Sequence, residues 1–280
     1  MPRAIWKGTI SFGLVTIPVG LFSAVAQRDI SFHLVDGRDL SPVRNKRVNE
    51  TTGEDVPWEA IVKGFDLPDG RRIILADEDF TAANVKATRT IDVLGAVCAR
   101  DVAPEYFDTP YLLVPEPQGA KAYALLREAL READRVAVAQ IVIRSRQRLC
   151  ALIPQGDALT LDVLRYPHEL RGAEDLPLPS SDLASLGVTG AEVALAKQLV
   201  ATIETHWDPT TYRDTYHDDL LALIERKADG EIIAPPPEPP AEEGGQVVDI
   251  MELLKRSVEQ ARGEREKRSA TPDFAAGTSA

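Results

Sequence analysis

The chain has 280 residues, of which 44% are hydrophobic, and its formal net charge at pH 7 is −12. This length allows one large domain or two small ones, and the hydrophobic fraction is enough for a sizeable core. The negative charge argues against indiscriminate binding of nucleic acid over the whole surface, but it is compatible with a local basic track. No apolar run is long enough to cross a bilayer, so we expect no membrane contacts, and the two cysteines favour a protein of the reducing cytoplasm.

The N-terminal segment is apolar but repeatedly interrupted. Arg3 and Lys7 precede an apolar run that reaches small residues at 23–27, an arrangement that also occurs in secretory signals. Its apolar residues, however, alternate with polar ones, first on even positions and, beyond Gly13, on odd positions. Alternation is typical of a half-buried strand, and a change of phase beside a glycine is typical of a β-bulge. We therefore expect a bent barrel strand here.

Residues 1–186 contain short strand-like runs separated by turns. Asp69-Gly70 and residues 155–157 are turn signals, and each is flanked by apolar runs. Apolar residues between 122 and 133 repeat at helical spacing, which predicts an amphipathic helix packed on the sheet. Because strands and helices do not strictly alternate, we expect an α+β fold whose core is an antiparallel β-barrel with covering helices.

From residue 187 onward the pattern becomes helical. Thr189 and Glu192 have the spacing of a capping box, and an apolar stripe follows them. Asp208, followed by a proline, is typical of the start of a second helix. We expect an antiparallel helical pair over residues 187–232 that completes the core and packs on the barrel or on a second subunit.

Residues 233–247 are rich in proline, glutamate and glycine and are interpreted as a linker. Asp249 and Glu252 then have capping-box spacing for a helix within 248–268. The apolar stripe of this helix consists of Ile250, Leu253, Leu254 and Val258. An isolated helix this short is marginal in water, so we expect the stripe to dock on a partner, with packing on the chain's own core as the alternative. Residues 269–280 are expected to be disordered.

Two segments concentrate positive charge. Residues 42–49 contain three basic residues and no acid, with Arg38 just upstream; the three are Arg44, Lys46 and Arg47. In residues 137–148, the period of two of a strand predicts that Arg144, Arg146 and Arg148 share one face, opposite Ile141 and Ile143. Composition alone favours a solvated loop for the first segment, and ion pairs with neighbouring acids are an equal alternative for the second.

One stretch near the C-terminal helices is rich in histidine and aspartate: His206, Asp208, Asp214, His217, Asp218 and Asp219. Imidazole and carboxylate groups together hold divalent ions, so a metal-dependent phosphohydrolase is one alternative. Only the pairs that Asp214 forms with His217 and Asp218 have helical ligand spacing, and such pairs are common on charged helix faces. We expect no metal, no cofactor and no catalysis. The two cysteines, Cys98 and Cys150, lie in apolar runs and are expected to be buried free thiols.

A series of short motifs follows in order along the chain: Ala4 to Val19, Lys46-Arg47-Val48 followed by Gly53, Val62-Lys63-Gly64, Phe107-Asp108 before Pro110-Tyr111, and Tyr212-x-Asp214-x-Tyr216. Their order and spacing resemble those of the bacterial Ku family over residues 4–224, and more loosely in the terminal helix. The resemblance implies a barrel-based core whose two copies interlock into a ring-shaped homodimer, through which the end of a DNA duplex is threaded. It also implies contacts with sugar and phosphate, little sequence preference, and recruitment of ligase D to double-strand breaks at the bacterial nucleoid in non-homologous end joining.

On this resemblance, both basic segments are candidates for the DNA-facing surface, and the helix from Asp249 is the candidate for binding ligase D. The chain departs from some relatives in two ways. Where they carry Cys-x-x-Cys, it has residues 49–52 without cysteine, so no zinc site is expected. Where they end in long lysine-rich tails, its tail is short and mixed in charge. A protein-only interaction scaffold without DNA binding is the alternative that the acidic net charge supports.

Overall fold

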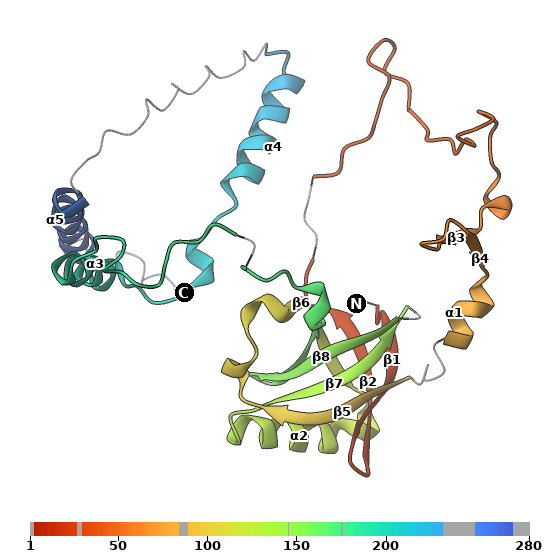
Figure 1. Ribbon diagram of the computed structural model, residues 1–280, viewed down its shortest axis with the longest axis horizontal. Helices are drawn as coiled ribbons and strands as arrows, with labels where there is room; N and C mark the ends of the chain where they lie inside the picture. Colours follow the sequence, from red (N-terminus) through yellow and green to blue (C-terminus); the bar gives the residue numbers. More distant parts are fainter. Residues whose placement is uncertain are drawn as a thin grey trace, which may run out of the picture. The chain divides into compact units, whose positions relative to one another are not determined.

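The computed structural model describes residues 3–26, 30–83, 89–144, 146–174, 176–231 and 250–270. The chain divides into two compact units, Met1–Gly172 and Ala173–Ala280 (Figure 1). The first unit holds a β-barrel and a long excursion from it, and the second unit is helical.

Seven strands of the first unit close into a barrel. In chain order they are β1 (Trp6–Phe12), β2 (Val15–Ser23), β5 (Thr90–Val97), β6 (Phe107–Pro115), β7 (Val136–Ile143), β8 (Arg146–Gln155) and β9 (Ala158–Leu164). Around the barrel the order is β1-β2-β6-β9-β8-β7-β5, and all neighbours are antiparallel except β1 and β5. The predicted α+β fold with an antiparallel barrel core is confirmed.

Aliphatic side chains fill the barrel interior. Ile10, Leu21, Ile91, Leu152 and Leu161 are fully buried. Leu152 lies directly opposite Leu161 across β8 and β9, and cross-strand partners of this kind share one face of a sheet. The alternating pattern of the sequence therefore selects the inward face of each strand.

Helix α2 (Ala120–Glu132) lies below the barrel in Figure 1, at the end where β6 finishes and β9 begins. The Tyr123 hydroxyl donates a hydrogen bond to the Leu113 carbonyl at 2.7 Å and accepts one from the Leu159 N–H at 2.6 Å. It thus satisfies buried backbone groups at the ends of two strands, which would otherwise be costly to bury. The amphipathic helix predicted for this segment is confirmed.

The N-terminal segment is a hairpin of two strands, so the prediction of one bulged strand is wrong. Phe12 lies opposite Val15, and a two-residue turn at Gly13 and Leu14 connects them. Gly13 has φ +60°, a conformation that glycine adopts without strain. A two-residue turn changes the phase of alternation just as a bulge does, and this is why the sequence pattern did not separate them.

The excursion between β2 and β5, residues 24–89, is called the arm. Its described part contains the 3₁₀ turn η1 (Trp58–Ala60), strands β3 (Lys63–Asp66) and β4 (Arg72–Leu75), and helix α1 (Asp77–Ala83). Strands β3 and β4 form a separate two-stranded sheet, which confirms the predicted hairpin at this place. Further 3₁₀ turns lie beside the barrel strands: η2 (Ala99–Asp101), η3 (Pro104–Tyr106), η4 (Pro117–Gly119) and η5 (Pro167–Glu169).

The second unit contains α3 (Gly190–Ile203), the turn η6 (Pro209–Thr211), α4 (Thr215–Ala228) and α5 (Ile250–Ala270). The Thr189–Glu192 capping box is present at the start of α3. Asp208 caps only the η6 turn, and α4 begins later with Asp214 as its N-cap, so the predicted start of the second helix is wrong. The helix that packs along α3 is α5, whereas the sequence predicted a pair between residues 187 and 232.

The packing of α5 divides its apolar stripe. Val258 is only 5% exposed and Leu254 is partly covered, whereas Ile250 and Leu253 are 63% and 46% exposed. The side of the stripe that contains Leu254 and Val258 therefore packs on the chain's own helices, as the alternative prediction had it. Outward docking stays a prediction for the other side. The predicted linker and most of the predicted tail lie outside the described residues.

The cysteines differ in burial. Cys150 is completely buried in the barrel, and desolvation raises the pKa of its thiol to about 12. Cys98 is a free cysteine that is only half-buried, so the expectation of two buried thiols is right for one of them. None of the helices in the described part of the chain combines the length and the apolar character needed to span a membrane.

Candidate nucleic-acid interface

Basic side chains gather at one end of the barrel. Strands β1, β5, β6 and β8 begin there and β2, β7 and β9 finish there, while α2 lies at the other end. The Lys and Arg residues at or beside these strand termini are Arg3, Lys7, Arg89, Arg144, Arg146, Arg148 and Arg165. We call this surface the basic end. In a chain of net charge −12, it is the kind of local concentration of positive charge that phosphate binding requires.

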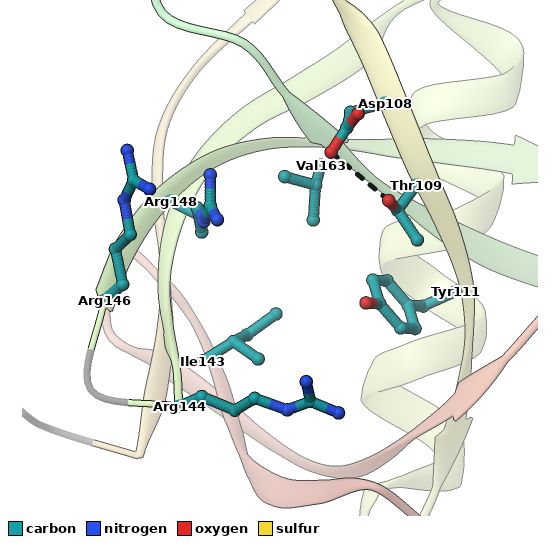
Figure 2. A pocket seen from close by; sticks show the side chains of 8 residues that line it. All are labelled: Asp108, Thr109, Tyr111, Ile143, Arg144, Arg146, Arg148 and Val163. Carbon is teal, nitrogen blue, oxygen red and sulfur yellow. Dashed lines mark hydrogen bonds between the residues drawn. The ribbon is translucent and has the colours of Figure 1, made fainter. Parts of the chain in front are cut away.

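The turn between β7 and β8 lines a pocket of about 290 Å³, here called the hairpin pocket. Figure 2 shows Arg144 and Arg148 reaching into this space opposite Tyr111, with Arg146 at its margin. Thr109 and Tyr111 of β6 add hydroxyl groups to the opposite wall. Guanidinium and hydroxyl groups are donors suited to an oxyanion.

The arrangement of these arginines differs from the prediction. Strand β7 ends at Ile143, β8 begins at Arg146, and these two residues lie opposite each other, as do Ile141 and Arg148. Arg146 and Arg148 therefore share the inward face with the two isoleucines, and Arg144 lies in the turn with φ +48°. The sequence prediction treated 137–148 as one strand and so put arginines and isoleucines on opposite faces, which is wrong. The three arginines nevertheless meet at one pocket.

Positive charge exceeds negative charge around the hairpin pocket. Arg146 pairs with Glu169 at 3.1 Å, and Asp108 pairs with Arg165 at 2.5 Å. A hydrogen bond from the Tyr166 N–H, followed by the nearby positive charges, lowers the pKa of Glu169, so this carboxylate stays ionised at neutral pH. Within the described residues, neither Arg144 nor Arg148 forms an ion pair or a side-chain hydrogen bond. The pocket can therefore accept an anion without first breaking a salt bridge.

A second pocket of about 690 Å³, the root pocket, lies where the arm leaves and rejoins the barrel. Phe22 belongs to the end of β2, and Arg89 directly precedes β5. Arg3, Lys7 and Arg89 line the pocket together with Trp6 and Phe22, and Trp6 also packs against the barrel core. Among the described residues that line it, none is acidic.

Gly8 shapes the strand beneath the root pocket. A Cβ atom at this position would collide with the carbonyl oxygen of Arg89 and with the indole ring of Trp6. The same carbonyl accepts a hydrogen bond from the Thr9 N–H at 2.9 Å. The missing side chain thus lets the backbone before β5 approach β1 and lets the indole lie over the β1 backbone.

Most of the basic arm residues that were predicted to face DNA contact other side chains of the arm. Arg38 pairs with Asp36 at 2.5 Å, Lys46 pairs with Asp55 at 2.7 Å, and the Arg47 guanidinium lies 4.4 Å from the centre of the Trp58 ring. Within the described residues, Arg44 has no such partner. Exposed ion pairs of this kind contribute little to stability, so these cations can exchange their partners for phosphate.

The metal-site alternative receives no support from the second unit. Asp214 accepts a hydrogen bond from the His217 N–H at 3.1 Å as the N-cap of α4. In the part of the chain that the structure describes, no group of three or more histidine, cysteine, aspartate or glutamate side chains is placed to hold a metal ion. Two residues of the pattern, Asp208 and Asp214, serve instead as N-caps.

Comparison with known proteins identifies the family. Residues 11–194 match the family model described as the Ku70/Ku80 β-barrel domain. The chain belongs to the Ku family. It is 41% identical over 278 residues to a Cupriavidus necator protein named "Non-homologous end joining protein Ku", covering 97% of this chain and 82% of that one. Proteins of the same name from Pseudomonas aeruginosa and Coxiella burnetii are 42% and 39% identical, covering 94% and 92% of this chain and 90% and 94% of theirs.

Part of the basic end of this Ku-family chain is not evident from its sequence. Arg3 and Lys7 were noted only as features shared with signal sequences, and Arg89 was not singled out. They meet because β1 pairs with β5 in parallel, with Thr9 opposite Thr90. Pairing between such distant segments leaves no local signal in the sequence.

Proposed function

We propose that this chain binds the ends of double-stranded DNA as a homodimeric ring, without sequence preference and without catalysis, in the repair of breaks by non-homologous end joining. The observation that carries the proposal is the basic end of the barrel in an otherwise acidic chain of the Ku family. Relatives that match most of the chain carry the name of that pathway.

The chemistry of the basic end suits backbone contacts. Duplex DNA carries one phosphate charge about every 1.7 Å of its axis, so a compact arginine cluster can engage several phosphates. Arg144 and Arg148 are the donors in the hairpin pocket without an ion-pair partner in the described structure. Phosphate contacts position a protein on DNA but carry no direct information about base sequence, which is the reason to expect little sequence preference.

Exposed apolar side chains support the homodimer part of the proposal. In the arm, Phe32, Trp58, Phe65, Ile74 and Phe80 are all exposed. A two-stranded sheet such as β3–β4 is marginal alone in water, and apolar surface of this extent marks an interaction site. We infer that a second copy covers it, because the ring expected from the family resemblance is built from two identical chains.

Comparing a linear duplex with a covalently closed circle of the same sequence, at two salt concentrations, tests the ring. We expect strong, salt-dependent binding to the linear form alone, because a closed ring can load only from an end. The complex should contain two copies of the 30.6-kDa chain by light scattering. Equal affinity for both forms would indicate association with the DNA surface, and binding to neither would favour the protein-only scaffold.

The exposed side of α5 is the proposed docking surface for ligase D. Ile250 and Leu253 project from α5 and are exposed, whereas α3 packs along the helix and Val258 is buried. Replacing Ile250 and Leu253 by aspartate should abolish ligase D capture while the helix remains packed through Val258. A pull-down with purified ligase D measures this, with Glu259→Gln on the same helix as the control. Capture that survives both aspartates would move the docking site elsewhere.

A further inference from the structure

We propose that Glu169 acts as a built-in phosphate surrogate at the hairpin pocket: it pairs with Arg146 until a phosphate of the DNA backbone takes its place. The inference rests on the proposed function, because it says how the pocket exchanges its own carboxylate for the DNA backbone. Glu169 is therefore a residue that sets the affinity for duplex DNA without touching the DNA itself.

The two ion pairs beside the hairpin pocket differ in how firmly they are held. Arg165 pairs with Asp108 at 2.5 Å and also donates hydrogen bonds to two backbone carbonyl groups at and just before the start of β6. Its guanidinium thus ties the end of β9 to β6 and would stay in place without Asp108. Arg146 pairs with Glu169 at 3.1 Å, and within the described residues its side chain forms no other ion pair or hydrogen bond.

Arg146 is placed to exchange its partner. Its side chain is 59% exposed and stands at the margin of the pocket (Figure 2). Only its Nη2 donates to Glu169, so the other N–H groups of the guanidinium can begin a phosphate contact before the ion pair breaks. Exposed ion pairs contribute little to stability, and this exchange therefore costs little.

Glu169, in contrast, is fixed in the fold. Its Oε2 accepts a hydrogen bond from the Tyr166 N–H at 2.8 Å, as part of the capping box of η5. This hydrogen bond and, after it, the positive charge of Arg146 lower the pKa of Glu169. The carboxylate therefore stays ionised at neutral pH and stays in place when Arg146 turns toward DNA.

A fixed carboxylate beside a mobile arginine suits a protein that moves along DNA. Contacts with phosphates are made and broken as a protein slides. Each time Arg146 leaves a phosphate, Glu169 offers it another anionic partner, so no unpaired cation is left between steps. The pocket then holds DNA through Arg144 and Arg148 at all times and through Arg146 in exchange with Glu169.

Glu169→Gln tests the surrogate while preserving the turn, because the amide oxygen of glutamine can still accept the Tyr166 N–H. We expect the variant to bind a linear duplex about fivefold more tightly per subunit, since Arg146 no longer has to leave an ion pair. The slope of log K against log salt should become steeper by up to about 0.9 per subunit, because one more cation is free to contact phosphate. Fluorescence anisotropy at several salt concentrations measures both quantities.

Glu128→Gln is the matched control. Glu128 pairs with Arg127 at 2.9 Å and with Arg131, in α2 at the other end of the barrel. The substitution removes the same charge and also breaks arginine pairs, but it leaves the hairpin pocket unchanged. Affinity and salt slope should therefore equal those of the unaltered protein, and a gain as large as that of Glu169→Gln would overturn the inference.

Arg146→Gln separates the ion pair from general repulsion between Glu169 and DNA. In a double-mutant cycle, Glu169→Gln should tighten binding only where Arg146 is present, because the two residues act as one unit. If the tightening persists in the Arg146→Gln background, Glu169 acts through its negative charge alone. That result would overturn the surrogate role.

The outcomes distinguish this inference from the proposed function. Unchanged affinity and salt slope for Glu169→Gln overturn the surrogate and leave end binding intact. If no duplex binds to any variant, the proposed function fails, and inorganic pyrophosphate then serves as the probe through its effect on the thermal unfolding midpoint. A larger rise in the midpoint for Glu169→Gln than for the unaltered protein, lost when Arg146→Gln is added, supports the surrogate, and equal rises overturn it.

Discussion

Replacing Arg144 by asparagine and Arg148 by glutamine should weaken binding to linear duplex DNA similarly for all sequences. Each substitution removes a charged donor from the hairpin pocket, and charge-assisted hydrogen bonds are worth about 1.5–3 kcal/mol, or about tenfold or more in affinity. The slope of log K against log salt should fall by up to about 1.8 per subunit, since each lost phosphate contact contributes about 0.9. Fluorescence anisotropy at several salt concentrations measures both quantities.

The substitutions are chosen to preserve the hairpin. Arg144 has φ +48°, and asparagine tolerates this left-handed conformation well. Glutamine at 148 keeps part of the aliphatic stem that packs at the barrel mouth. The double variant Arg100→Gln with Lys121→Gln changes the net charge equally at the other end of the barrel. If this control weakens binding as much as the hairpin variant, the pocket has no special role.

The arm can be assessed in the same titration. Arg44 is its one predicted DNA-facing residue without an intrachain partner in the described structure, so Arg44→Gln changes no visible contact. A further fall in the salt slope when it is combined with the hairpin variant would place both segments on the DNA path. An unchanged slope would remove Arg44 from that path.

Alternation in the sequence predicted strands well but left their connections ambiguous. Ile10 and Leu21 are buried as the pattern requires. The two-residue turn after Phe12 shifts the phase of alternation, and so does the pairing of Ile143 with Arg146. The first shift was interpreted as a bulge, and the second was overlooked, so the arginines were put on the wrong face. A strand period of two cannot distinguish a bulge from a tight turn, because both reverse whether odd or even positions carry the inward-facing side chains.

The predictions of where helices begin and of which helices pack together failed for a different reason. Asp208 and Asp214 both accept a hydrogen bond from a backbone N–H two or three residues later. One opens a 3₁₀ turn and the other opens α4, so the capping signal alone did not locate the helix. The packing of α5 on α3 joins segments that are far apart in the chain. Local patterns predict an apolar stripe but do not name what covers it.

Local sequence patterns likewise did not predict which residues line the root pocket. Its residues come from three separate segments around Trp6, Phe22 and Arg89. The β1–β2 hairpin brings the first two segments together, and the closure of the barrel by β1 and β5 adds Arg89. The basic segments visible in the sequence therefore supply only part of the candidate interface, and the remaining part follows from the pairing of the strands.

Gly8→Ala should destabilise the barrel at this closure. The new methyl group would meet the Arg89 carbonyl oxygen, which is backbone, and carbons of the Trp6 indole. Neither can move aside without disturbing the 2.9 Å hydrogen bond from the Thr9 N–H to that carbonyl or the packing of the indole. Overpacking of this type costs about 1–3 kcal/mol. Urea denaturation followed by circular dichroism should show a lower midpoint.

Gly95→Ala is the matched control, because it makes the same substitution in β5, the partner strand. A Cβ atom at Gly95 has no heavy atom within 4 Å, and its φ is not in the left-handed region, so alanine there should be neutral or stabilise by up to about 1 kcal/mol through the unfolded chain. Equal midpoints for the two variants would contradict the steric role of Gly8. A lower midpoint for Gly8→Ala alone, together with a changed Trp6 emission in a protein that carries phenylalanine in place of Trp58 and Trp207, would show that one contact both closes the barrel and positions the indole.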